Sequence, residues 1–481
     1  MPEIKTIAGR EIEYKWIALS VTTIGSLMAA IDSTIVILGI PEMMVELHAD
    51  MIAMIWVMMG YLLVSTIFLL TFGRVADMFG RVRMYNLGFV VFTIGSVLCG
   101  ISGDASHLIL SRFVQGIGAG MMIVNSVAIL TEAFPLAQRG LALGINSITW
   151  AAGGIIGPVL GGFILSVNSW RWIFFINVPI GIIGAAWGYA ALKELSERKK
   201  GERFDIPGAV SFSLSLVSLL LALTLGIQYG WLSAPILLLF VVFAIMLAVF
   251  LWWEQRTENP VLHLSLFRNR VYSFSVLAAM MQSLAIFAVN FLVVFYLIGV
   301  RGYTPLSAAM LLIPLPAFLA IMAPLSGLVS DRIGARVPAT IGLLIQSMAL
   351  LSLTYVTYST SYLRLAASLA IMGVGGGMFY APNVSAAMSA APSHRLGIAS
   401  ATLFTLRQTG MVTSYALSLA VAAASLPHNV MLQLFVGTNV ALGSELTKEF
   451  VFGMHNAFYV SMGLCLVSAV LSFARGKQRL A

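Results

Sequence analysis

Residues 73–83 read GRVADMFGRVR, and residues 327–336 read GLVSDRIGAR. The two stretches share an aspartate at an offset of 254 residues. A second motif, GIGAGM at 116–121, returns as GVGGGM at 373–378, at an offset of 257. Two independent matches at nearly the same offset indicate an internal repeat. We therefore expect a fold built from two related halves.

The composition indicates a membrane protein. Of the 481 residues, 59% are hydrophobic and 10% are charged, against about 45 to 50% and 25% in soluble proteins. No small-residue cleavage site follows the first apolar run, so we do not expect a signal peptide. The absence of a Walker-type phosphate loop argues against an ATP-driven pump, and no metal-site spacing is present. Cys99 and Cys465 fall in predicted spans, where they serve as apolar residues rather than as a disulfide.

The apolar runs predict fourteen transmembrane helices, because a span needs about 20 mostly apolar residues. The predicted spans are 16–40, 52–72, 84–102, 108–131, 141–166, 171–192, 207–228, 234–253, 272–298, 306–330, 338–357, 362–386, 397–425 and 452–474. Each half contains six of these spans, and the remaining two are an insertion between the halves. The expected domains are an N-terminal bundle (1–192), an inserted segment (193–271) and a C-terminal bundle (272–481).

The basic residues indicate the orientation of the chain in the membrane. An even number of spans places both termini on one side, and 21 of the 27 Lys and Arg residues fall on that side. The opposite side has four, and Arg112 and Arg407 lie within spans. Because Lys and Arg accumulate in cytoplasmic loops, both termini are expected in the cytoplasm. The net charge of +8 is thereby explained without a nucleic-acid partner.

Asp32 lies well inside the first predicted span, whereas the other acidic residues fall in loops, termini or span ends. A carboxylate at that depth costs several kcal/mol unless it faces water or a partner, so it indicates a functional site. Burial favours its neutral form, which suits the uptake and release of a proton. The alternative is that Asp32 only pairs with a cation to hold helices together.

Arg112, in the fourth predicted span, is the cation that Asp32 could pair with. Our hypothesis is that the pair forms in one conformation and separates in the other, which ties protonation to the direction of opening. The alternative is a permanent ion pair. The offset of 257 maps Arg112 to Leu369 and Gln115 to Met372, so these polar groups belong to the first half only.

These motifs together resemble the major facilitator superfamily and, within it, the fourteen-helix branch of drug:proton antiporters. The first copy of the repeated loop is similar to the superfamily's signature between its second and third helices. RFVQGIGAG (112–120) is similar to its fourth-helix motif, and GGIIGPVLGG (153–162) to the fifth-helix motif associated with antiporters. MAAIDSTIVILGIP (28–41) and WRWIFFINVPIG (170–181) resemble markers of the fourteen-helix branch.

The resemblance implies an all-α major facilitator fold of two six-helix repeats plus two inserted helices. It implies a multi-pass protein of the cell membrane, not an enzyme, that exports hydrophobic, cationic or neutral compounds in exchange for protons by alternating access. Its expected partners are the substrate, protons and the lipid bilayer, with no cofactor, and the expected state is a monomer. Two alternatives stay open. One is a dedicated exporter or symporter of a single metabolite or lipid, and the other is a non-transporting sensor, against which Asp32 argues.

The resemblance also implies that the repeated loops close the cytoplasmic face when the protein opens outward. The residues concerned are Gly73, Asp77, Gly80, Arg81, Asp331 and Arg332. The superfamily usually has a basic residue directly after the first aspartate, where this chain has Met78. The alternative is that the basic residues of these loops only set the topology.

The stretch GGIIGPVLGG contains Gly153, Gly157, Gly161, Gly162 and Pro158 within one predicted helix. Glycines spaced by four residues form a smooth face that lets another helix approach closely, and the proline can bend the helix. In the second half the offset maps Gly157, Pro158 and Gly161 to Ser414, Tyr415 and Ser418. We therefore expect a bendable, water-excluding seam that is specific to the first half and limits proton leak.

Polar or amphipathic residues within spans are candidates for lining a substrate cavity. They are Gln115, Asn125, Asn146, Trp150, Gln282, Asn290, Tyr380, Asn383 and Arg407. The alternative for most of them is a position facing lipid or a neighbouring helix. Arg407 corresponds to Trp150 in the repeat, and it could neutralise a substrate, repel it or extend toward the cytoplasm.

Overall fold

The computed structural model describes residues 4–7, 10–135, 138–195, 205–257, 260, 262–392, 396–424 and 444–476. Its first half contains a short antiparallel hairpin, β1 (Ile4–Ile7) and β2 (Arg10–Glu13), followed by helices. These are α1 (Tyr14–Glu46), α2 (Met51–Phe79), α3 (Arg81–Gly100), α4 (Ala105–Ala133), α5 (Arg139–Val167), α6 (Trp172–Phe175) and α7 (Asn177–Ala191). Two helices follow between the halves, α8 (Ile206–Tyr229) and α9 (Ala234–Glu254).

The second half begins with a 3-10 turn, η2 (Leu264–Arg268), and continues with α10 (Arg270–Phe295) and a π-helical turn, η3 (Tyr296–Val300). The remaining helices are α11 (Pro305–Leu312), α12 (Pro314–Ile333), α13 (Arg336–Leu353), α14 (Tyr362–Ala390), α15 (Leu396–Ala424) and α17 (Ser444–Ala474). The prediction of an all-α polytopic fold is confirmed. The terminal hairpin is the one described exception, and the sequence did not predict it.

Twelve helical segments of the described residues are long and apolar enough to cross a membrane. They coincide with twelve of the fourteen predicted spans. The other two predicted spans, 141–166 and 397–425, fall on α5 and α15, which have 29 residues each.

The helices show the repeat directly. α4 and α14 both have 29 residues, and they begin at Ala105 and Tyr362. α5 and α15 begin at Arg139 and Leu396, which is the same separation of 257 positions. The offset of 257 found in the sequence therefore corresponds to helices of equal length at equivalent places in the two halves.

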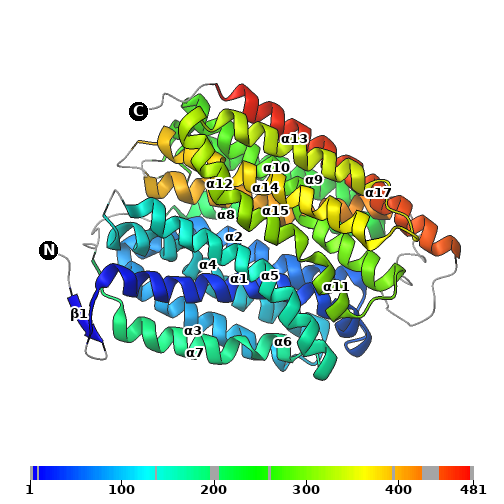
Figure 1. Ribbon diagram of the computed structural model, residues 1–481, viewed down its shortest axis with the longest axis horizontal. Coiled ribbons are helices and arrows are strands. Elements are labelled where there is room, and N and C mark those ends of the chain that lie inside the picture. Colours follow the sequence, from blue (N-terminus) through cyan, green and yellow to red (C-terminus); the bar gives the residue numbers. More distant parts are fainter. Residues whose placement is uncertain are drawn as a thin grey trace.

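The halves lie side by side, with the first half in blue and cyan and the second in green to red (Figure 1). α1 begins and α17 ends at the same end of the bundle, which we call the terminal face; the opposite end is the distal face. The halves meet along two edges, where α5 packs against α11 and α12 and where α2 packs against α15. α8 packs on both helices of the second edge, and α9 packs on α8.

Candidate functional site

Asp32 lies in the middle of α1 and has no exposed surface. Arg112 of α4 donates from a terminal nitrogen to Asp32 Oδ2 over 2.6 Å. The other carboxylate oxygen, Oδ1, accepts hydrogen bonds from Gln115 Nε2 (2.8 Å) and Asn177 Nδ2 (2.9 Å). Both oxygens of the carboxylate are therefore satisfied by groups from α4 and α7.

The guanidinium of Arg112 is enclosed as completely as the carboxylate, with 1% of the residue exposed. Its Nε donates to the carbonyl oxygen of Val57 (3.0 Å), and its carbon lies 4.3 Å from the ring centroid of Tyr61. A cation over an aromatic face is stabilised by about 0.5 to 2 kcal/mol. The pair is thus a dry, hydrogen-bonded arrangement inside the first half, the kind that can offset the cost of burying two charges.

Two members of this network were not singled out from the sequence. Asn177 lies in the stretch WRWIFFINVPIG, where it is the one uncharged amide among apolar residues, and Tyr61 lies in an apolar run of α2. Gln115 also donates to Ser96 Oγ of α3 (2.8 Å). A lone amide in a span was the available signal for Asn177, and nothing in the sequence marks Tyr61.

The other cavity candidates of the first half are also enclosed by it. Asn146 of α5 donates to Ser26 Oγ (2.9 Å) and Ser126 Oγ (3.1 Å), which joins α5, α1 and α4. Asn125 donates to the carbonyl oxygen of Met121 in its own helix. In this conformation Asn146 connects three helices of the first half, and Asn125 bonds only within α4.

In the second half, Asn383 lies near the terminal face with 1% of its surface exposed. It donates to the carbonyl oxygen of Ser275 (3.0 Å) and accepts from Arg475 (3.1 Å). Arg475 also donates to the carbonyl oxygen of Ala335, before α13. Burial and the neighbouring charge of Arg336 lower the pKa of Arg475 to about 10, so it stays charged at neutral pH. Asn383 therefore belongs to a node that ties α10, α13, α14 and α17 together.

The remaining candidates are partly exposed. Gln282 of α10 donates to Gln346 Oε1 of α13 (3.3 Å). Trp150, Asn290, Tyr380 and Arg407 are all half-buried. The guanidinium carbon of Arg407 lies 4.3 Å from the ring centroid of Tyr380, so the structure brings these two predicted residues together.

The glycines of α5 contact α1 on one face. A Cβ placed on Gly153 would overlap with Ala30, and one on Gly157 would overlap with Thr34 Oγ1 and lie 3.0 Å from the carbonyl oxygen of Ile31. Gly161 approaches Ile35 in the same way, at 2.8 Å. The backbones of α5 and α1 are thus in close contact directly beside Asp32.

Gly162 faces the other half instead. A Cβ there would lie 2.6 Å from the Cα of Leu306 and 3.1 Å from the carbonyl oxygen of Pro305, both in α11. Gly154, two turns earlier on the same face, would have only Pro316 nearby, at 3.9 Å. The glycines of α5 therefore let this helix contact α1 in its own half and α11 in the opposite half. The contact with α11 lies near the distal face.

The repeated loops lie at the terminal face. Gly80 adopts a φ of 109°, which favours glycine, and Glu194 accepts from the amide of Arg81 (2.7 Å) at the start of α3. Arg81 forms an ion pair with Glu132 at the end of α4.

In the second copy of the loop Arg332 is exposed, and Gly334 has a φ of 83°. Gly73 lies in α2 with space for a Cβ beside Val124. The side chains of Asp77 and Asp331 lie outside the described residues.

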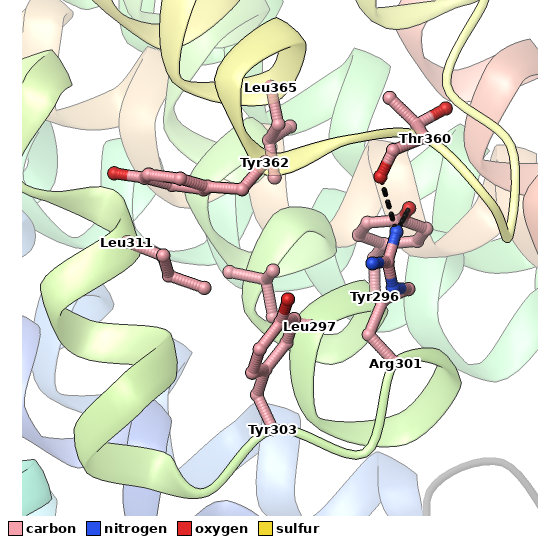
Figure 2. Close-up of a pocket in the computed structure, with 8 residues that line it drawn as sticks. All are labelled: Tyr296, Leu297, Arg301, Tyr303, Leu311, Thr360, Tyr362 and Leu365. Atoms are coloured by element: carbon pink, nitrogen blue, oxygen red, sulfur yellow. Dashed lines mark hydrogen bonds between the residues drawn. The ribbon is translucent and has the colours of Figure 1, made fainter.

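A recess opens at the distal face of the second half, with a volume of about 190 Å³ that includes solvent at its mouth. Figure 2 shows Arg301 beneath Thr360 and beside Tyr296, with Tyr303 and Tyr362 on the other side. Arg301 donates to Tyr296 Oη (3.3 Å) and to the carbonyl oxygen of Thr360. The hydrogen bond to Tyr296, followed by smaller contributions from Tyr303, raises the pKa of Arg301 although burial opposes the shift. Its donors hold the loops of this face together.

Comparison with known proteins identifies the family. The model of the Major Facilitator Superfamily matches residues 22–415. The chain is 32% identical over 409 residues to the multidrug resistance protein Stp of Mycobacterium tuberculosis (strain CDC 1551 / Oshkosh), covering 85% of this chain and 76% of Stp. It is 29% identical to the riboflavin transporter RibZ of Clostridioides difficile (strain 630), over 96% of this chain and 97% of RibZ.

A solved structure shares the fold over almost the whole chain. It is a bacterial homolog of the human lysosomal transporter Spinster in an inward-facing and unoccupied conformation, with a TM-score of 0.69 and 17% identity, covering 96% of this chain and 97% of that one. At this identity the match concerns the fold alone. Together with the family match and the apolar helices, it shows that the chain belongs to the major facilitator superfamily and is a multi-pass membrane transporter, not an enzyme.

Proposed function

We propose that this protein exports hydrophobic compounds across the cell membrane in exchange for protons, as a member of the fourteen-helix antiporter branch. The observation that carries the proposal is the Asp32–Arg112 pair, a titratable carboxylate buried in the membrane beside the close contact between α1 and α5. Such a group marks a proton or ion pathway. The likeness to Stp supports drugs or toxic compounds as the cargo.

The geometry supports the following cycle. Protonation of Asp32 removes its charge, and Arg112 keeps its contacts with Val57, Gln115 and Tyr61 within α2 and α4. The tie between α1 and α4 is then weaker, so α1 and α5, which are in close contact along the glycine face, can shift together. Loss of the proton restores the ion pair and the present packing. Protonation would thereby select between two conformations, as alternating access requires.

The proposed topology has fourteen spans, with α5 and α15 completing the twelve that meet the length and hydropathy criteria. The terminal face is proposed to be cytoplasmic, because it carries 21 of the 27 basic residues. The Spinster homolog that shares the fold is inward-facing, and we propose the same conformation here, with the contact of Gly162 and α11 closing the distal face. We further propose that the proton gradient drives transport without a cofactor and that the protein acts as a monomer.

A second candidate is a transporter devoted to one metabolite. The near-complete overlap with RibZ favours it, because that relative spans 96% of this chain. A panel of unrelated toxic compounds tested in a host without its own efflux pumps separates the two. Resistance to several chemically unrelated compounds supports drug export, and resistance to none supports the dedicated transporter.

The decisive experiment is substrate-dependent proton release from protein reconstituted in liposomes. Asp32→Asn is expected to abolish proton coupling, because the amide keeps the size of the side chain and cannot titrate. The control is Asp50→Asn, the same change at an exposed helix cap, where asparagine serves as well as aspartate. Unchanged coupling in Asp32→Asn would remove the proposed role of this residue.

A further inference from the structure

Arg407 differs from the other arginines of the interior in its hydrogen bonding. It is half-buried in α15, its guanidinium lies over the ring of Tyr380 in α14, and no hydrogen bond to it occurs within the described part of the chain. Arg112, Arg301 and Arg475 each donate to carbonyl or carboxylate oxygens. A guanidinium has five N–H donors, and those of Arg407 are unused.

The depth of Arg407 shows that its charge stays inside the membrane. Arg407 is 11 residues from the start of α15 at Leu396, and Tyr380 is 10 residues from the end of α14 at Ala390. At 1.5 Å per residue, both lie roughly 15 Å from the terminal face. The guanidinium remains level with its own backbone because it stacks on a ring at the same depth. In this conformation the stack on Tyr380 therefore holds the guanidinium below the terminal face.

Arg407 also lies where the two halves meet. The next residue, Gln408, reaches Ser65 Oγ of α2 across the interface (3.5 Å). The equivalent residue in the first half, Trp150 of α5, is half-buried at the other edge of the interface. Separation of the two halves along α2 and α15 exposes this level of α15, because Gln408 contacts α2 there.

The charge of Arg407 has no counterpart within the described residues. Asp32 is the one described acid in the middle of a span, and its two oxygens are occupied by Arg112, Gln115 and Asn177. Among the described residues in the middle of spans, a cationic substrate therefore finds no accessible carboxylate in this conformation. A charge in the membrane interior is costly without a partner, and the stack on Tyr380 offsets only part of that cost.

We propose that Arg407 and Tyr380 form a subsite for the anionic group of the transported compound, and that the cargo is an aromatic organic anion. The guanidinium fork matches a carboxylate or sulfonate in two parallel hydrogen bonds, and the Tyr380 ring provides an apolar surface beside it. The proposal rests on the export function proposed above and replaces the expected cationic cargo with an anionic one.

Two dyes that share a ring system and differ in charge test the proposal. Fluorescein is an anion at neutral pH and rhodamine 6G is a cation, and both are xanthenes. Binding of each to the purified full-length protein is measured by fluorescence anisotropy in detergent. Wild-type protein is expected to bind fluorescein, and Arg407→Gln to bind it at least tenfold more weakly while rhodamine 6G binding is unchanged or stronger.

Tyr380→Phe keeps the ring and is expected to retain fluorescein binding, whereas Tyr380→Leu is expected to weaken it. Arg364→Gln is the matched control, since it removes an exposed arginine of α14. Melting temperatures show whether each variant is folded. If wild-type protein does not bind fluorescein, or binds it as tightly as folded Arg407→Gln, the subsite is wrong.

The same variants in liposomes separate this proposal from the export function. A wild-type protein that binds fluorescein through Arg407 but releases no protons with any compound retains the subsite and loses the proposed antiport. A protein that exchanges protons for rhodamine 6G alone, with Arg407→Gln fully active, retains antiport and loses the subsite.

Discussion

The carboxylate of Asp32 accepts hydrogen bonds from a guanidinium and two amides, and it has no exposed surface. A buried pair of this kind is weak support for stability, because desolvation offsets most of the attraction, but removing one partner leaves an uncompensated charge. Asp32 can lose its charge by taking up a proton, and Arg112 cannot. Removing Arg112 is therefore expected to destabilise the protein more than neutralising Asp32 does.

This difference between the two residues predicts how substitutions in the pair change the stability of the protein. Arg112→Met leaves the carboxylate without its cation and is expected to destabilise the protein by about 3 to 5 kcal/mol. Asp32→Asn combined with Arg112→Met removes both charges and is expected to recover most of that loss. Melting temperatures in detergent provide the measurement. If the double variant melts as low as Arg112→Met alone, the pair is not what limits stability.

The sequence located Asp32, Arg112 and Gln115 because charged and amide groups are rare inside spans. It did not locate Tyr61, whose ring and hydroxyl look like any residue of an apolar run until the fold places them under Arg112. Asn383 shows the opposite case. It was a cavity candidate by the same rule, but its helix places it beside Arg475, a cation that follows the last helix. Which polar residues meet is decided by how helices are turned about their axes, and spacing along one helix does not specify that.

At the scale of elements, the glycines of α5 allow two separate close contacts, one on each of two faces of the helix. Gly157 faces α1 beside Asp32, and Gly162 faces α11 of the other half. Substitutions at the two positions are therefore expected to have different consequences. Gly154, where a Cβ has ordinary contact distances, provides the matched control on the same helix.

Gly157→Leu is expected to stop or uncouple proton exchange while the protein still inserts, because the side chain displaces α1 at the level of Asp32. Gly154→Ala is expected to behave like the wild type. Both are measured as substrate-dependent proton release from liposomes, with expression and melting temperature as controls. Full coupled exchange in Gly157→Leu would contradict the proposed role of this contact.

Gly162→Ala is expected to separate the halves at the distal face, because the clash is with the backbone of Leu306, which cannot rotate away. Spin labels on the exposed residues Ser166 and Thr304 report this distance across the interface. The native cysteines, Cys99 and Cys465, are buried, which limits background labelling. A longer distance than in the wild type is expected for Gly162→Ala and none for Gly154→Ala. An unchanged distance in both would show that the contact does not hold this face closed.

Two of the predicted spans are each divided into two helices beside prolines. The span at 306–330 is two helices that meet at Ile313, because Pro314 and Pro316 supply no amide hydrogen for a continuous helix. The span at 171–192 is likewise divided into α6 and α7, and Pro179 lies in the first turn of α7. Hydropathy averages over such breaks, so the sequence predicted the spans but not their division.

At the scale of the whole molecule, the proposed fourteen-span topology is tested by labelling single cysteines in intact cells. Leu232→Cys places a thiol in the turn between α8 and α9, where 86% of the leucine is exposed. Arg268→Cys places one at the terminal face. A membrane-impermeant maleimide is expected to label the first from outside and the second only after the cells are opened. Labelling of both from the same side would contradict the topology.

The two edges along which the halves meet differ, because α8 and α9 cover only one of them. Where α2 meets α15, α8 covers the contact and α9 packs on the outside of α8. Where α5 meets α11 and α12, no further helix of the described chain covers the contact. We therefore expect the covered edge to move less than the other edge when the halves move. If compounds enter from the bilayer, we expect them to enter between α5 and α12 rather than between α2 and α15.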